Sequence, residues 1–237
     1  MHPSASDIAG MIDHAILKPE LTRAEVDAQL DTAARYRIFS VCVRPSDVAY
    51  AVGRLEGTGV AVGTVIGFPH GTTSTGAKRA ESDQAIHDGA AELDMVLNIG
   101  RLRSGMVDEV EADIRAVVDV AGGRVVKVIL ETVFLSDDEV VAGCRAVERA
   151  GASFVKTSTG FAGGGATEHH VALMRRSVGE SVQVKASGGI RDLDTVLTYL
   201  AAGVTRFGTS GTATILDDAM AREAGDSAAA RVDATSY

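Results

Sequence analysis

Short, nearly continuous apolar runs alternate with amphipathic helical patterns along almost the whole chain. The apolar runs are rich in β-branched residues and are the right length for strands. Runs of this kind suit a parallel sheet that is covered on both faces, and the alternation therefore predicts an α/β fold. We expect strands at residues 11–16, 39–43, 61–68, 92–98, 124–131, 153–158, 182–187 and 205–210.

The segments between these runs carry the signals of helices. Several begin just after Ser, Thr or Asp, and several end at Gly, as helices commonly do. Eight strand–helix units in 237 residues predict a (β/α)8 TIM barrel, whose usual length is roughly 250 residues. A doubly wound open sheet is the alternative, because one sequence does not reveal the order of the strands. The predicted helices cover residues 23–36, 77–89, 108–123, 136–151, 167–179 and 191–203, with a further helical segment near 212–220.

Composition places the chain among ordinary globular proteins, with 46% hydrophobic and 23% charged residues. We expect one barrel domain over residues 1–222 and a small, polar tail over residues 223–237. The net charge of −9 argues against nucleic acid or an anionic membrane as a partner. No signal peptide or apolar membrane span is recognisable, and Cys42 and Cys144 give no disulfide framework. These features favour a cytoplasmic protein.

Three lysines lie inside apolar strand-like runs at a constant spacing. Lys127, Lys156 and Lys185 are each 29 residues apart, and a βαβ unit takes roughly 30 residues. They should therefore occupy similar places on successive strands. A lysine that is desolvated and crowded by a second cation loses its proton more easily, and the neutral amine can form a Schiff base with a carbonyl. The alternative is that the lysines only pair with carboxylates, for which Asp94 and Glu131 are the candidates.

Glycine-rich turns follow the last three predicted strands. The turns at residues 187–189 and 208–211 both lead into helical segments, and a barrel often binds phosphate at the loops after its seventh and eighth strands. Backbone amides that glycine leaves accessible can donate to phosphate oxygens. The third turn, at residues 160–165, either closes over a ligand or is a flexible loop.

Metal chemistry is not indicated. The six histidines show no ligand spacing, and His169 and His170 are adjacent on a predicted helix, so we expect their side chains to diverge. Cys42 lies in a predicted strand and is interpreted from its position as a small core residue. No nucleophile elbow is present.

A family resemblance rests on eight motifs, which are IDHAILKP, VCVRP, TVIGFPHG, ELDMVLNIG, VVKVILET, GASFVKTSTGF, VKASGGIR and RFGTS. Together they span residues 12–210 and closely resemble the deoxyribose-phosphate aldolase family. The resemblance implies a class I aldolase on a TIM barrel that needs neither metal nor cofactor. Its reaction would be the reversible cleavage of 2-deoxy-D-ribose 5-phosphate to acetaldehyde and D-glyceraldehyde 3-phosphate, in deoxyribose catabolism. A dimer or tetramer is an open expectation.

The same resemblance implies roles for individual residues. Lys156 corresponds to the Schiff-base nucleophile, Lys185 to the neighbour that lowers its pKa, and Asp94 to the group that moves protons. Gly188, Gly189 and Ser210 match the phosphate contacts of the family. Beyond the resemblance, the further residues expected to bind the substrate or its phosphate are Asp13, Cys42, Lys127, Thr159, Gly160 and Gly211.

The chain departs from the family pattern at three positions. Ala15 stands where many relatives carry Thr, Gly211 where they often carry a second Ser, and Phe161 where some carry Lys. Binding of the phosphate is then expected to depend on the Gly211 amide, without the cation that a Lys at position 161 would supply. The final residue, Tyr237, is either a proton carrier that visits the barrel mouth or part of a terminus with no role.

Two other functions stay open on the residues alone. The first is another Schiff-base lyase or a transaldolase-like enzyme that uses a different donor. The second is a sugar-phosphate-binding barrel without catalysis, which would not need a reactive lysine and an acid–base carboxylate.

Overall fold

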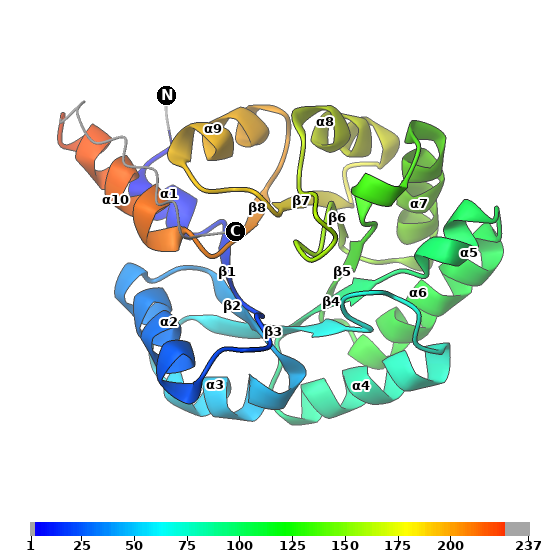
Figure 1. Cartoon of the computed structure of the whole chain (residues 1–237), viewed down its shortest axis with the longest axis horizontal. Helices are drawn as coiled ribbons and strands as arrows, with labels where there is room; N and C mark the ends of the chain where they lie inside the picture. The colour runs from blue at the N-terminus through cyan, green and yellow to red at the C-terminus, as the bar shows by residue number, and fades with distance from the viewer. Residues whose placement is uncertain (1–2, 226–237) are drawn as a thin grey trace.

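Eight parallel strands close into a barrel in the computed structural model, which describes residues 3–225 (Figure 1). Each strand pairs with the next along the chain, and β1 closes the barrel on β8 through the pair Ile12 and Phe207. This closure confirms the TIM barrel and excludes the open sheet. The strands are β1 (Ile12–Ile16), β2 (Ser40–Val43), β3 (Ala61–Ile66), β4 (Glu92–Val96), β5 (Val125–Ile129), β6 (Phe154–Lys156), β7 (Gln183–Ser187) and β8 (Arg206–Thr209).

Helices surround the barrel (Figure 1). All predicted helices are present, whereas three short ones were not predicted, because five to seven residues are too few to show a helical period. The helices are α1 (Ala5–Ala9), α2 (Arg23–Tyr36), α3 (Val48–Arg54), α4 (Thr75–His87), α5 (Ile99–Arg103), α6 (Val107–Ala121), α7 (Asp137–Ala150), α8 (Glu168–Ser177), α9 (Leu193–Ala201) and α10 (Thr212–Glu223), with 3₁₀ turns η1 (Pro45–Asp47) and η2 (Thr132–Phe134).

Local sequence explains where the elements begin and end. Thr22 and Ser136 form capping boxes at the starts of α2 and α7, which satisfies backbone donors that the helix leaves free. Gly151 ends α7 in the left-handed conformation. The strand predicted at residues 61–68 ends earlier, at Ile66, because Gly67 has a φ of 62° and turns the chain away from the sheet.

The hydrophobic core lies between the strands and the helices. Residues such as Val126, Val155 and Val184 point outward and are fully buried there. Their neighbours along each strand point to the barrel interior, because successive side chains alternate between the two faces. That interior is largely ionic, and its charged residues are Asp13, Glu92, Asp94, Lys127, Lys156, Lys185 and Arg206.

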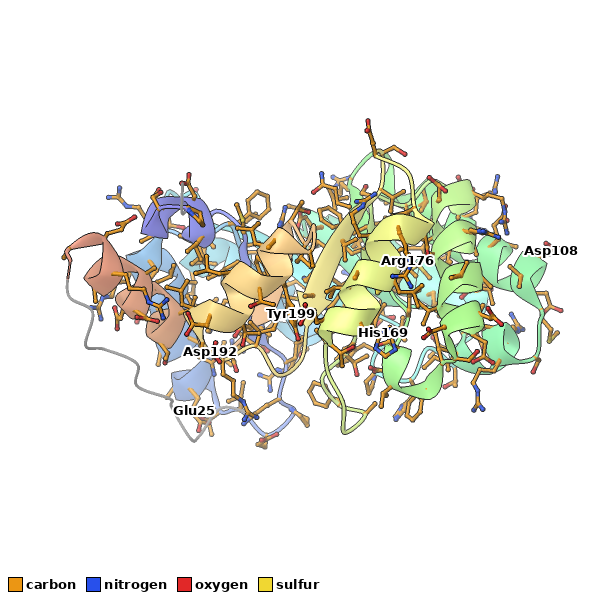
Figure 2. All side chains as sticks on the ribbon, turned by 90° about the horizontal axis from the view of Figure 1, so that it is seen from above. Glu25, Asp108, His169, Arg176, Asp192 and Tyr199 are labelled. Carbon is orange, nitrogen blue, oxygen red and sulfur yellow. The ribbon has the colours of Figure 1, made fainter. Side chains whose placement is uncertain are left out.

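Helices in βα units run back along the sheet, so they begin on the side where the strands end. Figure 2 shows this side: Glu25 and His169, in the first turns of α2 and α8, and Asp192, the N-cap of α9, lie along the same edge. The candidate site opens on this side. Within residues 3–225, no helix is long and apolar enough to cross a membrane. The predicted tail boundary falls at the end of α10, and Tyr237 lies outside the described residues.

Candidate active site

Two of the evenly spaced lysines meet at the top of the barrel. Lys156 ends β6, Lys185 lies on β7, and their Cα atoms are direct partners in the sheet. Both amines donate to the same oxygen, Oδ2 of Asp94 on β4, at 2.7 Å each. Three groups that are 1–3% exposed therefore converge on one point.

The third lysine lies beneath this point, so the prediction of a similar place for all three lysines was wrong for Lys127, which lies two residues below the level of Lys156 in the sheet. The Nζ atom of Lys127 donates to Glu92 at 2.6 Å and to Asp94 Oδ1 at 2.8 Å. Asp94 is therefore the carboxylate that pairs with all three lysines. The alternative partner, Glu131, instead accepts hydrogen bonds from the backbone N–H and hydroxyl of Thr159. Of the two candidate carboxylates, Asp94 therefore forms the ion pairs with the lysines. Glu131 has a left-handed backbone conformation, and the chain turns there so that its carboxylate reaches the loop after β6.

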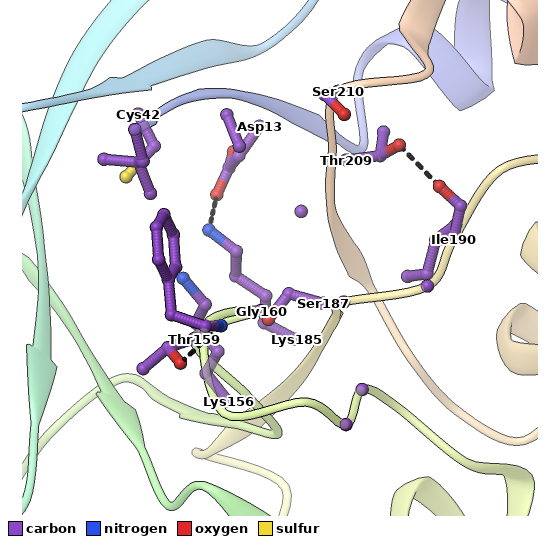
Figure 3. Close-up of a pocket in the computed structure, with 18 of the residues that line it drawn as sticks. Asp13, Cys42, Lys156, Thr159, Gly160, Lys185, Ser187, Ile190, Thr209 and Ser210 are labelled. Atoms are coloured by element: carbon purple, nitrogen blue, oxygen red, sulfur yellow. Dashed lines mark hydrogen bonds and ion pairs between the residues drawn. The ribbon is translucent and has the colours of Figure 1, made fainter. Parts of the chain in front are cut away.

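Asp13 and Arg206 complete the ionic interior. Lys185 donates to Asp13 Oδ2, as the dashed line in Figure 3 shows, and Arg206 donates to Asp13 Oδ1 at 2.9 Å. Arg206 also reaches Glu92 at 3.2 Å. Lys185 has the space to extend because β8 carries Gly208 beside it, where a Cβ atom would lie 3.2 Å from Cε of Lys185.

The two converging lysines differ in their proton affinity. Burial lowers the pKa of Lys156, Lys185 lowers it further, and the attraction of Asp94 only partly opposes them. Burial would also lower the pKa of Lys185, but Asp13 and Asp94 outweigh it and raise that pKa. The lysines around Asp94 likewise overcome its burial and hold the pKa of this carboxyl well below its usual range. Lys156 is therefore the amine of this pair that most readily becomes neutral.

A cavity of about 480 Å³ opens above the lysines. Figure 3 shows it extending from Cys42 and Asp13 at one end, past Lys185, to Ile190 and Ser210 at the other. The glycine turns at residues 188–189 line this second end, where both glycines have positive φ. The cavity therefore joins amine groups, a carboxylate and accessible backbone amides.

The glycine-rich segment at residues 160–165 lines the cavity rather than hanging free of it. Ala166 N–H donates to the carbonyl oxygens of Ser187 and Gly188 at 3.1 Å, which fastens the end of the segment to β7. Gly165 is required there, because a Cβ atom would lie 2.3 Å from the Gly188 oxygen. Phe161 packs edge-on against Phe68, with ring centroids 5.2 Å apart.

Most of the predicted substrate residues line this cavity, namely Asp13, Cys42, Lys156, Thr159, Gly160, Lys185, Gly188, Gly189 and Ser210. Cys42 also packs with Leu17 and Val65 as expected, and burial raises the pKa of its thiol to about 11. Asp94 and Lys127 instead lie below the cavity wall. Asp94 forms an ion pair with Lys156, which lines the cavity, and Lys127 forms an ion pair with Asp94.

Gly211 is placed differently from the expectation. It is not among the residues that line the cavity, and its N–H already donates to Thr209 Oγ1 at 2.9 Å. The Thr209 hydroxyl turns back toward the chain because it donates in turn to the Ile190 oxygen. The Gly211 amide is thus engaged inside its own turn.

The histidine pair is a clear correction. His169 and His170 do not diverge: their ring centroids are 5.4 Å apart, and each has a ring nitrogen within 4.8 Å of a carboxylate oxygen of Asp137. The rings can approach because both residues lie in the first turn of α8, beside the start of α7.

Sequence reasoning missed Glu92 and Arg206 in the ionic interior. A signal was available, since Glu92 precedes Asp94 by two residues and Arg206 precedes Gly208 by two. Residues two apart on a strand share a face. Both residues therefore had to point into the same interior as the recognised positions.

Comparison with known proteins places the chain in a family. Residues 8–227 match the DeoC/LacD family aldolases. The chain belongs to the DeoC/LacD aldolase family. It is 52% identical over 202 residues to deoxyribose-phosphate aldolase from Staphylococcus epidermidis, which covers 85% of this chain and 92% of the relative.

Solved structures of aldolases agree with this assignment. The aldolase QR15 matches with a TM-score of 0.88 and 38% identity, over 92% of this chain and 98% of that one. A tetrameric deoxyribose phosphate aldolase from Aeropyrum pernix matches with a TM-score of 0.83 and 31% identity, over 91% and 92% of the two chains. The residues that match the DeoC/LacD family therefore include all eight strands of the barrel and the charged residues of its interior.

Proposed function

We propose that this aldolase cleaves 2-deoxy-D-ribose 5-phosphate reversibly to acetaldehyde and D-glyceraldehyde 3-phosphate through a Schiff base on Lys156. The observation that carries the proposal is the convergence of the Lys156 and Lys185 amines on Asp94 below a cavity with a glycine-lined end. The name of the 52% identical relative supports the same substrate. A binding barrel without catalysis has no need of this arrangement.

The reaction begins when the neutral amine of Lys156 attacks the C1 carbonyl of the open-chain sugar. The carbinolamine loses water to give an iminium, which withdraws electrons from C2. When the C3 hydroxyl gives up its proton, the C2–C3 bond breaks and its electron pair forms the enamine. D-glyceraldehyde 3-phosphate then leaves, the enamine takes a proton at C2, and water releases acetaldehyde from Lys156.

Asp94 is the proton carrier in this proposal. Its carboxylate contacts both Lys156 and Lys185, so a proton taken from the substrate or from the carbinolamine can be held at this cluster and returned. Lys185 has a raised pKa and stays charged, which keeps a positive group beside the nucleophile. Its charge opposes protonation of Lys156.

The phosphate end is proposed at the turns after β7 and β8. Gly188, Gly189 and Ser210 line that end of the cavity, and the exposed Arg191 adds a guanidinium there. Helix α10 starts nearby without a side-chain cap, which leaves first-turn amides available to an anion. Because the Gly211 amide is engaged with Thr209, we assign it no direct phosphate contact.

Mass spectrometry after borohydride reduction tests the nucleophile and the donor together. Acetaldehyde should leave an ethyl group on Lys156, while dihydroxyacetone phosphate should leave no adduct. A Lys156→Ala variant should take no label, and Lys127 serves as an internal control because it lies beneath the cavity wall. Label on Lys127 or Lys185, or an adduct from dihydroxyacetone phosphate alone, would contradict the proposal.

The setting of the reaction is also proposed. We infer a role in deoxyribose catabolism in the cytoplasm, with the enzyme as a dimer or tetramer. The aldolase from Aeropyrum pernix is tetrameric, which supports an oligomer of this family. Light scattering of the purified protein would decide between the monomer, the dimer and the tetramer.

A further inference from the structure

The floor of the barrel carries two charged residues that do not reach the cavity. Arg206 is the first residue of β8 and Glu92 the first of β4, and both are at most 9% exposed. The Arg206 guanidinium also lies 3.6 Å from the centroid of the Phe39 ring, which fixes its position from below. Neither residue lines the cavity, so neither is placed to touch the substrate.

Charges in the connected interior do not balance if every group is ionised. Three carboxylates, on Asp13, Glu92 and Asp94, contact four basic groups, on Lys127, Lys156, Lys185 and Arg206. One positive charge is in excess, and an unbalanced charge in a buried site is costly. The cluster is neutral when one lysine gives up its proton.

Geometry decides which lysine that is. Lys127 and Lys185 each donate to two carboxylates, whereas Lys156, among residues 3–225, donates to Asp94 alone and shares that oxygen with Lys185. Arg206 also contacts two carboxylates, and its guanidinium does not lose its proton in proteins. Lys156 is therefore the basic group with the least compensation.

We propose that Arg206 is a positioning residue that supplies the third positive charge of the interior, so that Lys156 is left as the uncharged nucleophile. Glu92 acts in the opposite direction, because its negative charge favours a proton on Lys156. Without Arg206, three carboxylates would face three lysines, and a proton on Lys156 would complete the balance. Without the charge of Glu92, protonation of Lys156 would become still less favourable. The inference rests on the proposed Schiff-base function.

The other groups that face Lys156 lie outside the hydrogen-bonded cluster or are unchanged in the comparison of variants. Cys42 on β2 stays a neutral thiol, because burial raises its pKa to about 11. Asp94 on β4 and Lys185 on β7 belong to the cluster itself. Glu131, after β5, interacts with Lys156 but is hydrogen-bonded to Thr159 and is the same in every variant below. The lowered pKa of Lys156 agrees with the charge count.

The test is the pH dependence of Lys156 trapping by acetaldehyde and cyanoborohydride, followed by mass spectrometry. In Arg206→Met, the midpoint of the acidic limb should move up by about half a pH unit or more. In Glu92→Gln, it should move down by a similar amount. The double variant should return to the wild-type midpoint, and Arg206→Lys, which keeps the charge, should stay there too.

A purely structural role predicts a different pattern. It would lower the yield of trapped Lys156 in both single variants without opposite shifts, and it would make the double variant the worst. That result, or an unshifted midpoint in folded Glu92→Gln, would overturn the inference. If Arg206→Met does not fold, the isosteric Glu92→Gln carries the test alone. Label on another lysine at every pH would instead refute the proposed function, so the two failures are distinguishable.

Discussion

At the scale of single residues, the same side chain behaves differently according to the number of opposite charges around it. Lys127, Lys156 and Lys185 have equivalent sequence settings, yet burial and unequal pairing lower the pKa of Lys156 and leave the other two raised. Chemistry at one lysine therefore depends on its neighbours as much as on its own position.

The first prediction concerns Asp94. Asp94→Asn keeps the shape of the side chain but removes the carboxylate that can hold a proton between the two lysines. We expect a loss of about 10²–10⁴-fold in kcat for cleavage of the sugar phosphate, with imine formation partly retained. Asp47→Asn is the control, since Asp47 is also a buried carboxylate paired with basic side chains, those of Arg23 and Arg44, but does not line the cavity. A loss below about threefold would point to another proton carrier such as Glu131.

The second prediction concerns Gly189. Its φ of +78° is strained for any other residue, so Gly189→Ala should displace the backbone amides at the proposed phosphate end. A strain of about 1–2 kcal/mol should raise KM for the sugar phosphate by about tenfold, with little effect on free 2-deoxyribose. Gly105→Ala has the same strain at a φ of +73° far from the cavity and should change neither KM. Equal losses on both substrates would place the phosphate elsewhere.

At the scale of elements, a second buried ion pair fixes the end of the strand that carries Asp94. Lys78 on α4 donates to Asp113 on α6 and, at 2.9 Å, to the carbonyl oxygen of Val96 at the end of β4. Lys78 is fully buried and Asp113 is 2% exposed. Two helices and one strand are thus joined at a single ammonium group.

The third prediction follows from that contact. Asp113→Ala leaves the ammonium of Lys78 buried without its carboxylate, which should cost about 3–5 kcal/mol in the free energy of unfolding by urea. Asp31→Ala removes an exposed ion pair with Arg54 and should cost less than about 1 kcal/mol. Similar small losses in both variants would show that the buried pair does not hold α4 and α6 to β4.

At the scale of the whole molecule, the free energy of unfolding should fall in two stages as the pH is lowered. Burial lowers the pKa of His14 from 6.5 to about 4. The unfolded chain therefore takes up a proton below pH 6.5 that the folded chain resists. The contribution of the buried, neutral His14 to the free energy of unfolding is fully present above pH 6.5. It is lost as the pH falls toward 4, by up to about 3 kcal/mol.

The second stage belongs to the ionic interior. The pKa values of Asp13 and Asp94 are held below 3.8 by the surrounding cations, despite burial. Their contribution is present above that pH and is lost as the pH falls below it. Urea unfolding at a series of pH values measures both stages, which together form the fourth prediction. His14→Asn should remove only the upper stage, whereas His87→Asn, at an exposed histidine, should leave both unchanged. An upper stage that persists in His14→Asn would assign it to another group.

The sequence by itself determined the alternation of strands and helices and the chemical type of the residues at the strand ends, whereas only the structure showed that the sheet closes into a barrel. Apolar runs and helix caps are local patterns, and they located the strands that carry Asp94, Lys156 and Lys185 to within a few residues. The even spacing of the lysines is also local, and it placed Lys156 and Lys185 at one level of the sheet but not Lys127, which lies two residues lower. Motif resemblance then named the family, which the comparisons confirm.

The tertiary structure alone decided which charges meet. The hydrogen bonds of Asp94 to Lys156 and Lys185 join residues 62 and 91 positions apart, and that of Asp13 to Lys185 joins residues 172 apart. Such contacts exist only after the barrel has closed, because closure turns the inward side chains of β1, β4, β6, β7 and β8 into one interior. The same closure placed Arg206 beside Asp13 and Glu92. Electrostatic balance depends on these distances through space, which separation along the chain does not encode.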